Sequence, residues 1–238
     1  FTFQNIFSDN TFYEKINELA PGNFLIIDNN GFKRRNKYWD FHFESFNSVL
    51  NINKIDIIDL LTKSIELQSD TTERIGCHLS AGIDSSLIAS ILAEKKGSLS
   101  TFTAGFEENK KLKTDFFNEI KYSERLSRKL KSKHFNVIIK PEDIFKSLDN
   151  LIQCIELPRM GQSYPNYLLN NLVGKKVRIV YSGLGSDELF GGYPWRYRNY
   201  DIRKNFVETL YSSWQRIFSK EEKKEIYQPS FYKKNLND

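Results

Sequence analysis

A tight turn of small and hydroxylated residues, Ser-Ala-Gly-Ile-Asp-Ser-Ser at residues 80–86, separates two apolar segments of different period. Residues 75–79 form a short apolar run of the kind found in buried strands, and residues 87–93 follow a helical pattern. A strand, a small-residue turn and the start of a helix make one strand–loop–helix unit. Strand and helix patterns continue to alternate through residue 182, which predicts a parallel sheet.

The predicted turn suits a phosphate group. A helix N-terminus offers free backbone N–H groups and the positive end of the helix dipole. Ser80, Ser85 and Ser86 add hydroxyl donors without bulk. Asp84 would repel a phosphate, so its carboxylate fits only if a divalent cation lies between the two anions. The turn therefore predicts a site for a Mg²⁺-bound polyphosphate, and an ordinary capping turn on a buried helix is the alternative.

A second segment repeats this arrangement at residues 177–193. Residues 177–181 alternate like a half-buried strand and lead directly into Ser-Gly-Leu-Gly-Ser-Asp-Glu-Leu-Phe-Gly-Gly-Tyr. Its four glycines allow positive φ angles and close approach of backbone to a ligand. Asp187 follows the strand, and open α/β sheets bind ligands at the carboxyl ends of their strands. Asp84 and Asp187 could therefore share one cation.

Both segments resemble signatures of known enzymes. Residues 80–85 resemble the Ser-Gly-Gly-x-Asp-Ser pyrophosphate-binding loop (PP-loop) of ATP pyrophosphatases, with Ala81 in place of the first glycine. Residues 182–193 resemble the Ser-Gly-Glu-Gly-(Ala/Ser)-Asp-Glu-(Leu/Val)-Phe-Gly-Gly-Tyr signature of the asparagine synthetase family. Residues 101–106, 119–131 and 133–139 resemble the following strand, helix and strand of its synthetase domain. The resemblance covers about residues 14–195, and the chain is identified as a member of the glutamine-hydrolysing asparagine synthetase family.

The resemblance implies an α/β fold of the adenine nucleotide alpha hydrolase type, a parallel-sheet PP-loop synthetase domain over residues 46–238. Residues 1–45 are similar to the last β-strands of the family's N-terminal nucleophile glutaminase domain, with a hairpin turn at residues 29–31. The family's N-terminal cysteine and a downstream lysine have no counterpart in the sequence. We therefore expect a truncated synthetase domain that acts as a homodimer or with a complementary chain.

The family also implies a reaction and roles for individual residues. ATP would activate a carboxylate as an acyl-AMP with release of pyrophosphate, and ammonia or a glutamine donor would displace AMP, as when aspartate becomes asparagine. The remaining roles concern binding of ATP and Mg²⁺. Asp84 and Asp187 would hold the cation and take part in the catalytic step. The pyrophosphate would be bound by the PP-loop residues Ser80, Ala81, Gly82, Asp84, Ser85 and Ser86. The nucleotide would be contacted by Leu79, Ala104, Ser182 and Gly183. Leu79 and Ala104 could equally be ordinary core residues.

Leu184 limits the substrate prediction. The family signature has glutamate at this position, which serves the acyl-adenylate step and the attack by ammonia, and leucine can do neither. An amidating enzyme or cyclase acting on another carboxylate is therefore an alternative. So are a tRNA-modifying PP-loop enzyme of the lysidine synthetase type and a non-catalytic remnant.

Composition narrows the partners and the compartment. The net charge of +5 comes from 35 basic and 30 acidic residues, with the lysines dispersed, so nucleic-acid binding is not expected. The sequence has no apolar run near the ~20 residues of a membrane helix, and a secretory leader is not expected. Cys77 and Cys154 are predicted to be buried free thiols in a reducing cytoplasm, without zinc. A cytoplasmic protein acting on small molecules is expected.

Overall fold

The computed structural model describes residues 9–42, 54–107, 118–156 and 163–194, together with residues 222, 225 and 226. The chain divides into two compact units. One comprises residues 1–48, 155–160 and 194–238, and the other residues 49–154 and 161–193. The second unit contains both sequence signatures. The border predicted between residues 45 and 46 stays a prediction.

A four-stranded sheet forms the centre of the second unit. Its strands are β3 (Ile75–His78), β4 (Ser100–Phe106), β5 (Lys133–Ile139) and β6 (Ile179–Tyr181). They lie in the order β5-β4-β3-β6, and every neighbouring pair is parallel. The chain adds strands outward from β3 to β5 and then returns to place β6 on the other side of β3. The order therefore reverses between β3 and β6, which is where open parallel sheets bind ligands.

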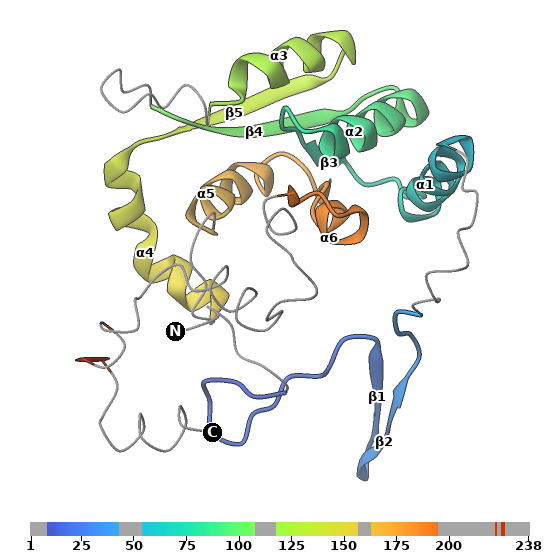
Figure 1. The fold of residues 1–238 in the computed structure, drawn as a ribbon, viewed down its shortest axis with the longest axis vertical. Coiled ribbons are helices and arrows are strands. Elements are labelled where there is room, and N and C mark those ends of the chain that lie inside the picture. The colour runs from blue at the N-terminus through green and yellow to red at the C-terminus, as the bar shows by residue number, and fades with distance from the viewer. Residues whose placement is uncertain are drawn as a thin grey trace, which may run out of the picture. The chain divides into compact units, whose positions relative to one another are not determined.

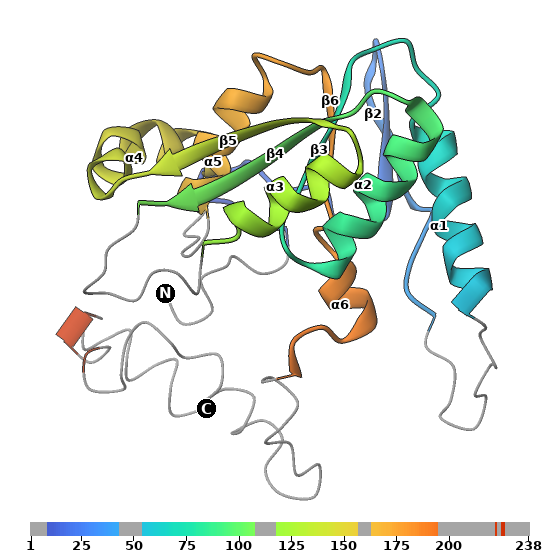
Figure 2. The same ribbon diagram turned by 90° about the horizontal axis from the view of Figure 1, so that it is seen from above.

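Helices cover both faces of this sheet (Figure 1). Figure 2 shows α2 (Ile83–Lys96) and α3 (Ile120–Lys129) on one face, with α1 (Lys54–Gln68) beside α2 and α5 (Ser163–Val173) on the other face. Each face has its own apolar cluster. The first is built on Ile75, Cys77 and Leu79 with α1 and α2, and the second on Phe102 with Leu169, Val173 and Val177. Alternate side chains of each strand thus enter opposite layers.

Two further helices complete the described part of this unit. Helix α4 (Pro141–Ile155) follows β5, and the five-residue α6 (Ser186–Phe190) follows β6. In both views α6 lies beside the N-terminal end of α2 (Figures 1 and 2). The second signature is therefore next to the first.

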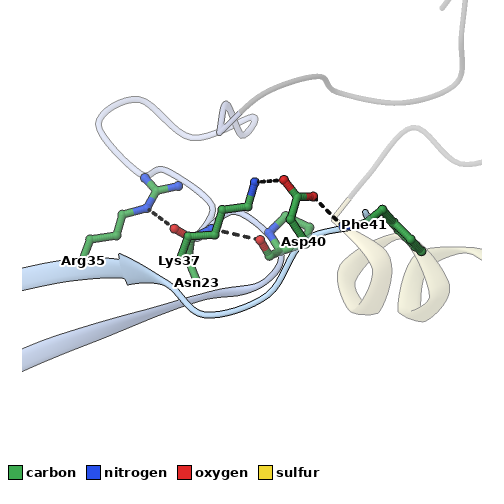
Figure 3. Close-up of polar contacts among 6 residues, drawn as sticks. Asn23, Arg35, Lys37, Asp40 and Phe41 are labelled. Atoms are coloured by element: carbon green, nitrogen blue, oxygen red, sulfur yellow. Dashed lines mark hydrogen bonds and ion pairs between the residues drawn. The ribbon is translucent and has the colours of Figure 1, made fainter. Parts of the chain in front are cut away.

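The other unit contains an antiparallel hairpin of β1 (Asn23–Asp28) and β2 (Gly31–Lys37), with a β-bulge between Ile26 and Ile27. Gly31 has φ +102°, a left-handed conformation that glycine adopts without strain. Figure 3 shows the open end of the hairpin, where Lys37 pairs with Asp40 and Arg35 Nε donates to Asn23 Oδ1 at 3.4 Å. The hydrogen bond from Lys37 and the one from the Phe41 N–H lower the pKa of the exposed Asp40 carboxyl.

The predicted α/β fold is confirmed, including a parallel sheet and the hairpin with its turn before Gly31. The prediction that both cysteines are buried is wrong for Cys154. Both thiols are free, but only Cys77 is buried. Helix α4 buries Ser147 and Leu151, whereas its last turn leaves Cys154 exposed, although helical spacing puts all three on one stripe.

Two further points concern the segment after Tyr193 and the question of a membrane-spanning helix. Residues 206–218, where large apolar side chains recur at helical spacing in the sequence, lie outside the described residues. Among the helices that the structure describes, none combines the length and apolar character needed to cross a bilayer.

Candidate nucleotide site

The predicted PP-loop folds around two serine hydroxyls. Ser85, in the first turn of α2, accepts the Ser80 N–H at 3.1 Å, and the two Oγ atoms are 2.7 Å apart. Ser80 Oγ in turn accepts the Gly82 N–H at 3.0 Å. The two hydroxyl groups thus accept hydrogen bonds from backbone N–H groups of the turn. They stabilise the short connection between β3 and α2. Ser85 is buried, so its hydroxyl is chiefly structural in this geometry.

The start of α2 presents free backbone donors. Its N-cap residue, Gly82, has extended backbone angles (φ −70°, ψ 152°) and makes no side-chain capping hydrogen bond. The Ser86 hydroxyl points back to the Gly82 carbonyl at 2.6 Å rather than outward. The Ser86 N–H donates to the same carbonyl at 3.2 Å, so the N–H groups that precede it in the first helical turn are the donors that an anion would meet. Ala81 does not adopt a positive φ, so alanine carries no left-handed strain in place of the family's glycine.

Gly183 brings the second signature against this helix start. A Cβ atom on Gly183 would lie 2.8 Å from the Ser85 nitrogen and 3.0 Å from Asp84 Cβ. Only glycine allows the β6 loop to approach the α2 backbone this closely. The predicted residues Asp84, Ser85 and Gly183 are thus side by side, although about a hundred residues separate the two loops in sequence.

The rest of the second signature makes a sharp turn. Gly185 has φ +99° and ψ −17° and serves as the N-cap of α6, a conformation that favours glycine. Asp187 is half-buried in the first turn of α6, and a Cβ on Gly192 would lie 2.7 Å from its Cγ atom. Ser182 Oγ accepts the Leu184 N–H at 3.2 Å. Leu184 itself is 83% exposed, so its side chain belongs to the surface of the site rather than to the core.

Leu79 and Ala104 lie on opposite layers of the sheet. The Leu79 side chain is buried in the cluster below α1 and α2, and its carbonyl accepts a hydrogen bond from Thr103 Oγ1. Ala104 is half-buried against the cluster on the α5 face. The structure does not bring these two side chains together, and only the backbone of Leu79 adjoins the PP-loop.

Glu119, the first residue of the segment predicted as a helix at residues 119–131, joins the site although the sequence analysis gave it no role there. Its Oε2 atom accepts the Ala81 N–H at 3.3 Å. Glu119 directly precedes α3, so this helix reaches the loop as well as the β6 segment that packs on the start of α2. The contact spans 38 residues of sequence, and a lone glutamate before a helix gives no signal that could have predicted it.

Burial affects two titratable groups on β3, below the loop. Desolvation raises the pKa of the Cys77 thiol to about 12, which disfavours the thiolate that a nucleophile would need. Desolvation also lowers the pKa of His78, which keeps the imidazole neutral. The chemistry of the site therefore depends on its hydroxyl, carboxylate and backbone groups.

Asp84 and Asp187 are the two carboxylates that the sequence predicts to share a magnesium ion. Within the described ranges, no three His, Cys, Asp or Glu side chains gather as a metal site. Mg²⁺ is commonly held by one or two carboxylates, with phosphates and waters as its other ligands. Asp84 and Asp187 are both half-buried, in the first turns of α2 and α6, and would supply two carboxylates without a complete protein cage.

Comparison with known proteins assigns the family. The family model described as asparagine synthase matches residues 56–236, well over half of the chain. The chain belongs to the asparagine synthase family. It is 26% identical over 193 residues to the glutamine-hydrolyzing asparagine synthetase 1 of Bacillus subtilis strain 168, covering 81% of this chain and 30% of the relative. The human glutamine-hydrolyzing asparagine synthetase is 30% identical over 145 residues, 56% of this chain and 24% of the relative. The chain thus spans about a third or less of these two relatives.

Similar solved structures include an NH3-dependent NAD synthetase from Campylobacter jejuni, at 17% identity and a TM-score of 0.36, covering 75% of this chain and 90% of that one. An NMN synthetase from Francisella tularensis has 19% identity and the same TM-score, covering 58% of this chain and 56% of that one. The family assignment depends on the sequence match, and the fold on the sheet order described above.

Proposed function

We propose that the site binds ATP with Mg²⁺ and forms an amide bond through an acyl-AMP intermediate with release of pyrophosphate, as in the asparagine synthetases. The observation that carries this proposal is the close packing of Gly183 against Asp84 and Ser85. It joins the two family signatures at the point where the strand order reverses. A polyphosphate placed there would meet the free N–H groups of α2 and two carboxylates.

The proposed chemistry divides among the residues of the chain. The N–H groups at the start of α2 would bind the β- and γ-phosphates, with the Ser80–Ser85 hydroxyl pair fixing the turn below them. Asp84 and Asp187 would hold Mg²⁺, which offsets the negative charge that grows on the departing pyrophosphate. Ser182, Gly183 and the backbone at Leu79 would contact the nucleotide, and Ala104 would border the adenine.

The identity of the carboxylate substrate depends on Leu184 as well as on the family. Asparagine formation from aspartate and ammonia or glutamine is the reaction that the family suggests. Leu184 presents an exposed apolar side chain where the family signature has an acid. A leucine there cannot accept a proton from the attacking amine. We therefore propose an acceptor other than aspartate as the second possibility, with the same activation by ATP.

Pyrophosphate release tests the proposal. The full chain would be incubated with ATP, Mg²⁺ and a panel of carboxylates with ammonia or glutamine, and pyrophosphate and AMP would be measured. Release in equal amounts that depends on one carboxylate supports the proposal. Binding of ATP without release on any member of the panel identifies a non-catalytic nucleotide-binding protein instead.

Asp84→Asn gives a residue-level prediction. The amide keeps the size of the side chain but removes the charge that would hold Mg²⁺, so we expect Mg²⁺-dependent ATP binding to weaken by about tenfold or more and turnover to be lost. Calorimetric titration with ATP at fixed Mg²⁺ measures the change. Asp70→Asn, an exposed carboxylate just before β3 and so at the opposite ends of the strands, is the matched control. Unchanged binding in Asp84→Asn would refute the cation role.

A further inference from the structure

The three backbone N–H groups of the loop, at residues 80–82, all have acceptors. Those of Ser80 and Gly82 are satisfied within the turn, by Ser85 Oγ and Ser80 Oγ. The N–H of Ala81 has an acceptor from elsewhere in the fold, the Glu119 carboxylate at 3.3 Å. Serine hydroxyls of the loop therefore accept two of these N–H groups, and Glu119, the N-cap residue of α3, accepts the third.

The fold holds Glu119 in place from both sides. On its C-terminal side, the Ser123 N–H and Oγ donate to the Glu119 carbonyl at 3.0 and 2.7 Å. On its N-terminal side, Asn118 Nδ2 donates to the Phe106 carbonyl at 3.4 Å and so ties the segment to the end of β4. Glu119 is half-buried. Its reach to Ala81 follows from how α3 begins.

A glycine in β4 allows this docking. A Cβ on Gly105 would lie 2.6 Å from Ile120 Cγ1 and 2.8 Å from Asn118 Oδ1. The residues on either side of Glu119 thus occupy the space that a side chain at residue 105 would need. The close approach of α3 to β4 brings Glu119 to the loop across the edge of the sheet.

We infer that Glu119 is a positioning residue of the nucleotide site, which fixes the Ala81 peptide so that the N–H groups of α2 face the phosphates. This inference depends on the proposed binding of ATP. Ala81 is exposed and has no other hydrogen bond to hold its N–H among the described contacts. A carboxylate accepts a backbone N–H more strongly than a neutral group does, so the tether limits rotation of this peptide. Because the loop is already ordered before the ligand binds, less conformational entropy is lost on binding.

Two substitutions separate this role from general stability. Glu119→Ala removes the acceptor, and we expect the affinity for Mg²⁺-ATP to fall by about tenfold while the unfolding midpoint stays near that of the wild type. Glu119→Gln keeps a carbonyl oxygen for the same N–H, and we expect its affinity within about threefold of the wild type. Glu124→Ala is the matched control, because Glu124 also lies on α3 and accepts one hydrogen bond, from Asn136 Nδ2 at 3.0 Å.

Calorimetric titration of the full chain with ATP at fixed Mg²⁺ gives the affinities, and amide hydrogen exchange at Ala81 reports the tether itself. Faster exchange at Ala81 in Glu119→Ala, together with weaker binding, supports the inference. Equal or tighter binding by Glu119→Ala overturns it, as does a Glu119→Gln variant as weak as the alanine variant. A wild-type chain that binds no ATP refutes the proposed function instead, which separates the two failures.

Discussion

At the scale of single residues, glycines determine how closely the two signature segments approach each other. Gly183 lets the β6 loop touch the α2 backbone, and Gly185 makes the left-handed turn into α6. Both lie in a signature whose glycine content can be read from the sequence. What each glycine touches cannot be read there, because the neighbour of Gly183 is the peptide between Asp84 and Ser85. The sequence predicts that these loops meet, and the structure shows which atoms do.

Gly183→Ala tests this contact. The added methyl group would lie 2.8 Å from a backbone nitrogen, which cannot rotate away as the end of a side chain can. We expect a loss of about 1–3 kcal/mol in the free energy of unfolding and weaker ATP binding, because the β6 loop must move off α2. Urea denaturation and ATP titration measure the two effects.

Gly174→Ala is the control for the glycine substitution. A Cβ there meets only the Asn170 carbonyl oxygen, at 3.5 Å, so we expect a change within about 0.5 kcal/mol. Similar stability losses in both variants would show that the Gly183 contact is not what sets the spacing of the loops.

At the scale of elements, the strands that the family resemblance implied agree best with the structure. The predicted strands at residues 101–106 and 133–139 agree with β4 and β5 to within a residue. Cys154 shows a limit of helical spacing. The spacing predicts which side of a helix faces the core, but it does not predict how far along the helix that side stays covered by other residues. Glu119 shows a second limit. Its partner is set by the order of the strands, and that order is a property of the whole sheet.

The docking of α3 on β4 predicts a coupling between two residues. Gly105→Ala should lower the free energy of unfolding by about 1–3 kcal/mol, because its methyl group would overlap Ile120. Ile120 is buried, so Ile120→Ala alone should cost about 2–5 kcal/mol. In the double variant the new methyl group occupies space that the isoleucine has vacated. Urea denaturation should therefore show a loss smaller than the sum of the two by about 1 kcal/mol or more. Additive losses would show that the two positions do not compete for space.

At the scale of the whole molecule, two half-buried imidazoles, His78 and His134, predict that stability depends on pH. His134 on β5 lies opposite Thr101 in the β4–β5 register, and its Nδ1 atom is 2.9 Å from Thr101 Oγ1. The same hydroxyl is 3.0 Å from Ser132 Oγ, so the imidazole takes part in a polar network inside the sheet. Burial lowers the pKa of both His134 and His78. The Nε2 atoms of both are buried without a hydrogen-bond partner in the described structure, where a proton would be costly.

The sign of the resulting pH dependence follows from linkage. An unfolded histidine takes up its proton with a pKa of about 6.5, whereas these folded imidazoles resist protonation at that pH. The unfolded state therefore binds more protons below about pH 6.5, and the free energy of unfolding should fall as the pH drops from 7.5 to 5.5. Urea midpoints at the two pH values measure the loss. His134→Asn should reduce the difference between the midpoints, and substitution of the exposed His42 by asparagine should leave it unchanged. A wild-type midpoint that stays constant or rises toward pH 5.5 would contradict the burial of neutral imidazoles as a source of stability.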